Sequence, residues 1–175
     1  MKKNVVLTGL LAAMMFFTTA YVLHIPIVGG GYIHLGDTIL YIAATLLPTP
    51  YAMAVGVIGG GLADVMVGAA AWAPSTVIIK AVMALAFTAK KERMLCSRNL
   101  LAPVWSGLIC IGGYFVAEVI MLCLSGSGFL AAQTAALAAV PFNGVQALAS
   151  GVAFILLAVA MDRLSVKQRL ERLFK

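Results

Sequence analysis

Four ionisable side chains lie within apolar stretches of this chain, namely Lys80, Asp37, Asp64 and Glu118. Lys80 falls inside the apolar run 74–89. A cation in a membrane span costs roughly 2.5–3.5 kcal/mol on insertion scales, so Lys80 needs a charged partner or a water-filled cavity. Two roles are therefore open for Lys80: an ion pair with Asp64 or Glu118, or a contact with a polar ligand.

These polar groups are expected to lie at one depth. Asp64, Lys80 and Glu118 each fall roughly 9 Å below the same end of their expected spans, at 1.5 Å per helical residue. Asn143 and Gln146 begin the last span at that end. A channel or a proton relay needs polar groups at several depths, so the pattern indicates a pocket open on one side.

Aromatic side chains near this level can form flat walls against a ligand. The expected ligand contacts are Lys80, Glu118, Asn143, Gln146, Asp64, Trp72, His34, Tyr41 and Tyr114. Structural roles are the alternatives for some of them: helix packing for Asp64 and a place at the membrane interface for Trp72 and His34. Asp37, which follows Gly36, is either part of this polar layer or a helix N-cap.

The composition predicts the elements that must position these residues. The 175-residue chain is 63% apolar and 10% charged, with a mean hydropathy of +1.06. Such a chain is typical of an all-α integral membrane protein with about six spans of roughly 20 residues. We expect a single membrane domain, 1–175, with spans at about 4–24, 36–47, 51–70, 74–89, 101–124 and 141–162.

Charge predicts the orientation. Except for Lys80, the twelve Lys and Arg residues fall at the N-terminus, in 90–98 and in 163–175, which share one side if the spans number six. The positive-inside rule then places both termini in the cytoplasm and the pocket outside. These dispersed charges form no nucleic-acid-binding surface, so no nucleic-acid partner is expected.

Small residues predict where helices meet. Gly56, Gly60 and Asp64 lie on one face of the expected span 51–70, so Asp64 should point into protein. A second strip of small residues in the first span comprises Gly9, Ala12 and Ala13. This strip either packs within the bundle or docks onto another membrane subunit.

Catalytic motifs are missing from the sequence. It contains no GxxxxGK[ST] loop and no HExxH motif, and its three cysteines form no CxxC pair. We therefore expect a binding protein that is not an enzyme and has no cofactor or metal, with energy supplied by other subunits.

Four motifs resemble the substrate-binding S components of energy-coupling factor (ECF) vitamin transporters, in the subgroup with riboflavin-type and hydroxymethylpyrimidine-type members. The resemblance covers nearly the whole chain. The motifs, in order, are Gly31-Tyr-Ile-His-Leu-Gly-Asp37, Gly59-Gly-Gly-Leu-Ala-Asp64, Trp72-Ala-Pro-Ser-Thr-Val-Ile-Ile-Lys80 and Pro141-Phe-Asn-Gly-Val-Gln146.

The resemblance implies a function. An S component of this kind sits in a bacterial-type cell membrane, captures a vitamin from outside and works with a transmembrane T component and two cytoplasmic ATPases. It is thought to topple in the bilayer and release its cargo inside. The implied docking face is the strip at Gly9 and Ala13, and the implied gate between the first two spans contains Gly29, Gly30, Gly31 and Tyr32.

The ligand expected from these residues is a small polar heterocycle such as pyridoxine or a hydroxymethylpyrimidine, or the larger riboflavin. The main alternative is a stand-alone secondary transporter, which would need no ATPase partner. The sequence lacks the inverted repeat found in many such transporters. A structural subunit that binds no small molecule is a third possibility.

Overall fold

The computed structural model describes residues 2–22, 24–26 and 31–173. The molecule is about 81% helical, which confirms the all-α class. The elements in chain order are α1 (Lys2–Phe17), the π-helical turn η1 (Thr18–Val22), β1 (Ile25–Pro26), β2 (Tyr32–Ile33), α2 (Gly36–Leu46), α3 (Thr49–Met66), the 3-10 turn η2 (Ala70–Trp72), α4 (Ala73–Ala84), α5 (Ser97–Leu124), α6 (Phe129–Arg163) and α7 (Val166–Leu173).

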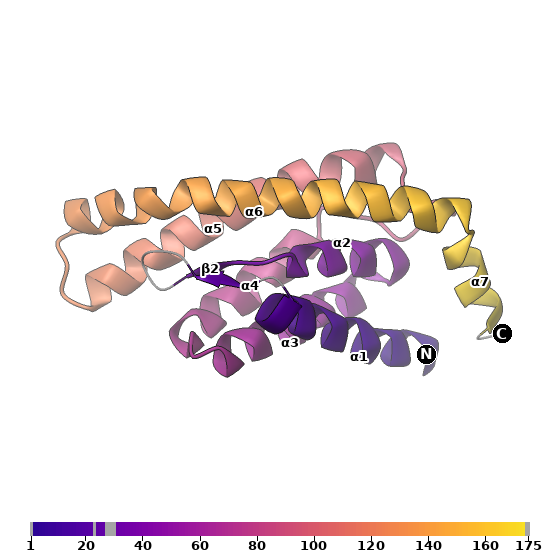
Figure 1. Ribbon diagram of the computed structural model, residues 1–175, viewed down its shortest axis with the longest axis horizontal. Helices are drawn as coiled ribbons and strands as arrows, with labels where there is room; N and C mark the ends of the chain where they lie inside the picture. The colour runs from indigo at the N-terminus through magenta and orange to yellow at the C-terminus, as the bar shows by residue number, and fades with distance from the viewer. Residues whose placement is uncertain (1, 23, 27–30, 174–175) are drawn as a thin grey trace.

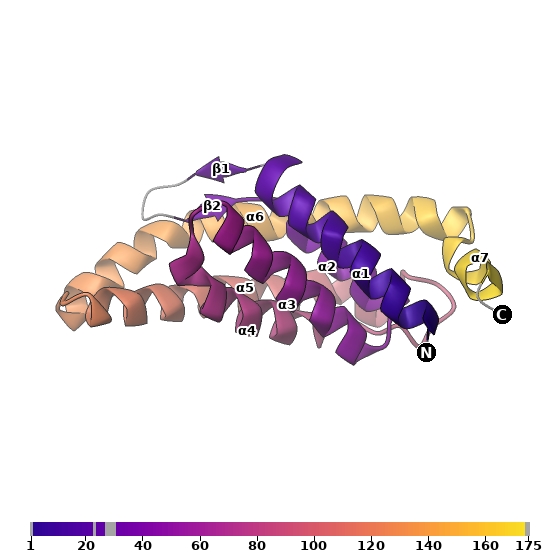
Figure 2. The same ribbon diagram turned by 90° about the horizontal axis from the view of Figure 1, so that it is seen from below.

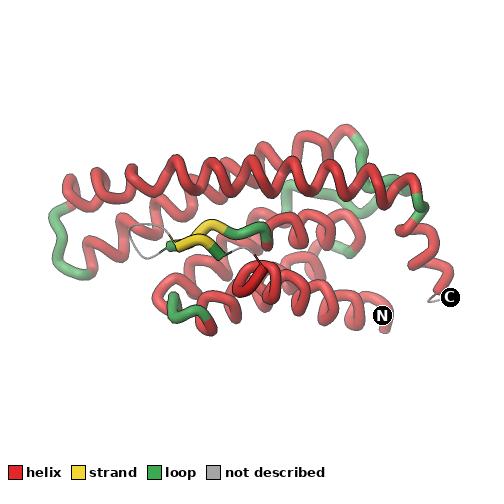
Figure 3. The backbone as a smooth tube through the Cα atoms, in the orientation of Figure 1, coloured by secondary structure: helices red, strands yellow, loops and turns green. Residues whose placement is uncertain are grey.

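The helices form an elongated bundle (Figure 1). α5 and α6 run side by side as its two longest members and extend beyond α3 and α4 at the end far from both chain ends. Figure 2 shows the same extension after a quarter turn. In Figure 3 the short antiparallel strands lie near the middle of the bundle's length, next to the start of α2. We refer to β1, β2 and His34 as the outer hairpin.

Several helices are suited to a membrane. Lys2–Val22, Ser97–Leu124 and Phe129–Arg163 are long and apolar enough to cross one, and Gly36–Leu46 and Ala70–Ala84 are shorter apolar helices. Large apolar side chains are widely exposed on the bundle's surface, as expected where lipid is the solvent. The chain is thus a multi-pass membrane protein.

The last span is longer than expected. It was expected at about 141–162, but α6 runs unbroken over Phe129–Arg163 with Pro141 inside it. The Ala-rich segment before Pro141 favours helix, and Ala132 and Ala136 pack with Val119 of α5. This packing holds the helix together across the one backbone hydrogen bond that proline removes.

The expected span at 74–89 ends early, because α4 stops at Ala84. Arg98 donates to the carbonyl oxygens of Leu85 at 2.8 Å and Ala86 at 2.9 Å. Asn99 donates to the carbonyl of Thr88 and accepts from its N–H, both at 2.8 Å. These bonds satisfy backbone groups that a longer helix would have paired internally.

Glycines set the closest helix contacts. A Cβ on Gly59 of α3 would lie 2.8 Å from the Cβ of Met15 and 2.9 Å from the carbonyl oxygen of Ala12 in α1. A Cβ on Gly56 would lie 3.0 Å from that of Lys80. A Cβ on Gly60 would lie 3.1 Å from Thr76 Cγ2 of α4, and Asp64 is buried. The expectation that the face of α3 with Gly56, Gly60 and Asp64 packs closely, with Asp64 turned inward, is therefore confirmed.

Candidate functional site

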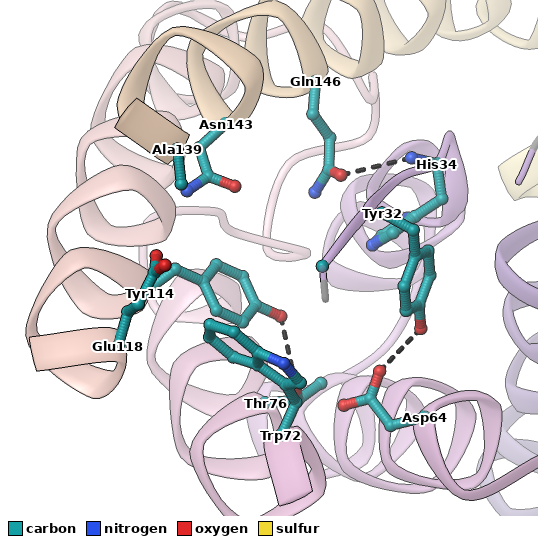
Figure 4. A pocket seen from close by; sticks show the side chains of 11 residues that line it. Tyr32, His34, Asp64, Trp72, Thr76, Tyr114, Glu118, Ala139, Asn143 and Gln146 are labelled. Carbon is teal, nitrogen blue, oxygen red and sulfur yellow. Dashed lines mark hydrogen bonds between the residues drawn. The ribbon is translucent and has the colours of Figure 1, made fainter. Parts of the chain in front are cut away.

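A cavity of about 40 Å³ lies between the outer hairpin, the end of α3, the start of α4 and inner turns of α5 and α6. Figure 4 shows side chains from these elements converging on it. Its lining comprises Gly31, Tyr32, His34, Asp64, Trp72, Thr76, Tyr114, Glu118, Ala139, Asn143 and Gln146. The sequence motifs therefore meet in space, although they lie far apart along the chain.

Asp64 and the outer hairpin meet on one side of the cavity. The Tyr32 hydroxyl donates to Asp64 Oδ1 at 2.6 Å (Figure 4). Asp64 is 4% exposed, and its Oδ2 has no hydrogen-bond partner within the described part of the chain. A buried carboxylate oxygen without a partner is costly, so this atom is suited to accept a hydrogen bond from a ligand.

Gln146 ties the outer hairpin to the buried core. Its Oε1 accepts from the backbone N–H of His34 at 3.2 Å, and its Nε2 donates to Asp37 Oδ2 at 3.0 Å. Since the Asp37 carboxylate can only accept, it fixes which way the Gln146 amide points. The hairpin position is thus linked through a single side chain to Asp37 of α2.

His34 is buried at the base of the outer hairpin. Burial lowers its pKa to about 4, so the ring is neutral near pH 7. Its Nδ1 accepts from the backbone N–H of Gly36 at 3.0 Å, which places the ring proton on Nε2. The outer hairpin therefore brings a neutral imidazole to the cavity.

Aromatic rings form the opposite wall. Trp72 and Tyr114 meet edge to face, with ring centroids 5.9 Å apart, and the Tyr114 hydroxyl is hydrogen-bonded to that of Thr76 at 3.1 Å. Tyr32 stands across the cavity from them (Figure 4). Rings on two sides can hold a flat heterocycle by stacking or edge contacts.

The cavity is acidic. Asp64 and Glu118 line it, and no Lys or Arg is among its described lining residues. Glu118 is 7% exposed, and its carboxylate makes no hydrogen bond to the residues that the structure describes. Such a lining favours ligands with N–H and O–H donors and disfavours anionic groups such as phosphate.

Lys80 is buried but does not line the cavity. Of the two roles left open for Lys80, an ion pair is present, but its partner is neither Asp64 nor Glu118: Lys80 Nζ pairs with Asp37 Oδ1 at 2.6 Å. This pair also replaces the N-cap alternative for Asp37, since α2 has no side-chain cap. Lys80 Nζ lies 5.3 Å from the ring centroid of Tyr114, so it supports the cavity wall from behind.

Tyr41 also lies away from the cavity. It is fully buried in the core and stacks on Phe87 with centroids 4.8 Å apart. The placement corrects the expectation of Tyr41 as a ligand contact. Tyr41 lies one turn along α2 from Asp37, and that turn places it deeper in the bundle than the cavity.

The residues expected at the gate and in the docking strip differ in where the structure places them. Gly31 and Tyr32 line the cavity, whereas Gly29 and Gly30 lie outside the described residues. On α1, Gly9 and Ala13 are exposed, but Ala12 is 3% exposed and packs on α3. Ala12 therefore belongs to the internal packing face of α1.

Two lining residues were missed by the sequence reasoning. Thr76 lies one helical turn before Lys80, and Ala139 lies one turn before Asn143. Both could have been found by extending the expected polar positions by four residues along the same helix face.

Comparison with known proteins agrees with these motifs. The family described as ECF-type riboflavin transporter, S component, matches residues 1–163. No curated protein matches the chain. The match spans the outer hairpin, the cavity and all of the helices from α1 to α6. The chain therefore belongs to the family of S components of ECF-type riboflavin transporters.

Proposed function

We propose that this chain binds riboflavin at the cavity under the outer hairpin, as the substrate-binding subunit of an uptake system. The vitamin is suggested by the family, and the convergence of one set of aromatic, amide and acidic side chains on one cavity carries the proposal. The isoalloxazine ring offers a flat face, an imide N–H donor and carbonyl acceptors. The ribityl chain adds hydroxyl donors for which Asp64 and Glu118 provide acceptors.

In this proposal the protein spans the membrane six times with both termini inside. With six spans, eleven of the twelve Lys and Arg residues lie on one side of the membrane, and the cavity lies toward the other side. The positive-inside rule then makes the cavity accessible from outside.

The outer hairpin acts as the gate in this proposal. A cavity of about 40 Å³ is far smaller than the roughly 300–1,000 Å³ of typical small-molecule sites. A tricyclic ligand can enter only if the hairpin moves away. Opening breaks the Tyr32–Asp64 and His34–Gln146 hydrogen bonds, which frees Asp64 and Gln146 for the ligand.

The energy for uptake comes from partners in this proposal. A transmembrane T component and two cytoplasmic ATPases supply it, and the exposed Gly9 and Ala13 of α1 provide the contact with the T component. Small exposed residues on a membrane helix permit close approach of another helix.

A fluorescence titration of riboflavin with the purified protein tests the binding site. Asn143→Ala removes a polar group that lines the cavity, so we expect affinity to fall by about tenfold or more. Thr134→Ala is the matched control, because Thr134 is exposed on the same helix away from the cavity.

The same titration with pyridoxine and hydroxymethylpyrimidine tests the choice of vitamin. Tight binding of either one with no riboflavin binding would reject riboflavin as the ligand while leaving the site intact. Equal affinity of Asn143→Ala and wild type for every ligand would reject the site.

A further inference from the structure

A second, larger cavity lies at the opposite, basic end of the molecule. Its volume is about 450 Å³, within the range of small-molecule sites. It lies between the start of α1, the α2–α3 turn, the segment after α4 and α7. Its lining comprises Lys3, Asn4, Leu46, Pro48, Thr49, Thr88, Ala89, Lys90, Lys167 and Glu171.

Lys167 builds one wall of this cavity. It is 7% exposed, and its Nζ donates to the carbonyl oxygens of Thr45 at 3.0 Å, Ala89 at 2.6 Å and Lys91 at 2.6 Å. An ammonium group has three donors, so Lys167 has none left for a ligand. Its role is to hold α7 against the ends of α2 and the segment after α4.

Lys3 and Lys90 are the free cations of the cavity. Their Nζ atoms make no hydrogen bond or ion pair with the residues that the structure describes. They approach from α1 and from the segment after α4, which are distant in sequence. Thr49 adds a hydroxyl and opens α3, whose N-terminus carries partial positive charge. Glu171 is the one acid in the lining, so the balance of free charge is positive.

α7 indicates where this cavity lies relative to the bilayer. Leu170 of α7 packs against the core, while Leu173 of α7 is 77% exposed and Leu164, just before the helix, is 60% exposed. Arg169 and Arg172 lie on the same short helix. Exposed leucines among arginines are typical of a helix in the membrane interface, at the level of lipid headgroups.

We propose that Lys3 and Lys90, which both line this cavity, bind an anionic phosphate group. The group is carried either by the headgroup of an anionic phospholipid or by a small soluble phosphate. Both sources present the same chemistry to two lysines and the start of a helix.

Native mass spectrometry tests the proposal on the full-length protein. The protein is released from phosphatidylcholine nanodiscs that contain a minor fraction of phosphatidylglycerol, and retained phosphatidylglycerol is counted. We expect the double variant Lys3→Ala/Lys90→Ala to retain about tenfold less than wild type. In the control Lys2→Ala/Lys91→Ala, which removes the same charge next to the cavity, we expect less than about a twofold change.

A second arm separates the two sources. The unfolding temperature is measured in detergent with sodium phosphate and with sodium chloride at equal ionic strength. A phosphate-specific rise that Lys3→Ala/Lys90→Ala abolishes identifies a soluble phosphate, and lipid retention without that rise identifies the headgroup. Equal losses in the two double variants, or neither retention nor a phosphate-specific rise in wild type, would overturn the proposal. Lys3→Arg/Lys90→Arg should retain the lipid, which shows that loss in the alanine variant reflects charge.

Discussion

Gln146 is the residue at which the cavity, the outer hairpin and the buried ion pair meet. Its amide accepts from His34 and donates to Asp37, and Asp37 in turn pairs with Lys80. All four of these groups are buried. A ligand that displaces the hairpin from Gln146 therefore acts on a polar network that extends into the centre of the bundle, where hydrogen bonds are strong and unpaired groups are costly.

The buried ion pair gives a prediction about stability. Lys80→Met leaves the Asp37 carboxylate without its counter-ion in an apolar interior, which typically costs roughly 3–5 kcal/mol. We expect a clear fall in unfolding temperature. Riboflavin binding should also weaken, because a buried carboxyl without its counter-ion tends to take up a proton. Asp37 can then donate as well as accept, so it no longer fixes which way the Gln146 amide points. Thermal unfolding and the binding titration measure the two effects.

The double variant Asp37→Asn/Lys80→Met is the control. It removes both charges but keeps an amide at position 37 that can bond Gln146, so it should recover much of the stability lost in Lys80→Met. A double variant as unstable as the single one would show that the ion pair is not the cause.

The sequence predicted that Lys80 is buried and requires a partner, because an isolated cation in an apolar helix is too costly. It did not predict that the partner is Asp37. Which acid faces Lys80 depends on how α2 is rotated about its axis against α4. Ten of the eleven residues of α2 are buried, so α2 has no exposed polar face from which that rotation could be predicted. The same missing rotation explains why Tyr41 was expected at the ligand level.

At the scale of elements, the crossing of α1 and α3 holds the first half of the bundle together. Gly59→Ala places a methyl group 2.8 Å from the Met15 Cβ and 2.9 Å from the backbone oxygen of Ala12. Backbone cannot yield as a flexible side chain does, so we expect a loss of about 1–3 kcal/mol in stability. Thermal unfolding of the purified protein measures it.

Gly112→Ala is the matched control for this prediction. Gly112 lies on an exposed face of α5, and its added Cβ would meet no described residue beyond the adjoining turns of α5 within 4 Å. Its unfolding temperature should stay the same or rise slightly, because alanine favours helix over glycine. If Gly59→Ala unfolds no earlier than Gly112→Ala, the close crossing of α1 and α3 is not required for stability.

The remaining helix boundaries could be predicted only in part. Pro50 and Pro74 lie in the first turns of α3 and α4, where proline is tolerated. Pro141 follows the opposite pattern inside α6. The difference lies in tertiary contacts, because the segment before Pro141 packs on α5, and single-chain sequence patterns do not reveal such a partner.

At the scale of the whole molecule, the proposed docking face on α1 can be tested. Gly9 and Ala13 are exposed there, and a Cβ added to Gly9 would meet no described residue beyond the adjoining turns of α1 within 4 Å. We expect Gly9→Leu/Ala13→Leu to bind riboflavin as wild type does but to lose most uptake when produced with its T component and ATPases. The bulk prevents close helix contact.

Leu148→Ala on α6, which changes an exposed residue of the bundle, should leave both binding and uptake unchanged. Vesicle uptake of labelled riboflavin, normalised to protein amount, provides the measurement. Full uptake by the Gly9→Leu/Ala13→Leu variant would show that the docking face does not lie on α1.

The length of α6 bears on the membrane itself. Its 35 residues reach about 52 Å at 1.5 Å per residue, against a hydrocarbon thickness of about 30 Å. The end at which α5 connects to α6 is apolar, because Leu124, Phe129 and Leu130 are all more than half exposed. If α5 and α6 stood along the membrane normal, these side chains would lie in water. The two helices must therefore tilt, or the bilayer around them must thicken. Unless the pair tilts, that thickening falls at the end of the bundle far from both chain ends.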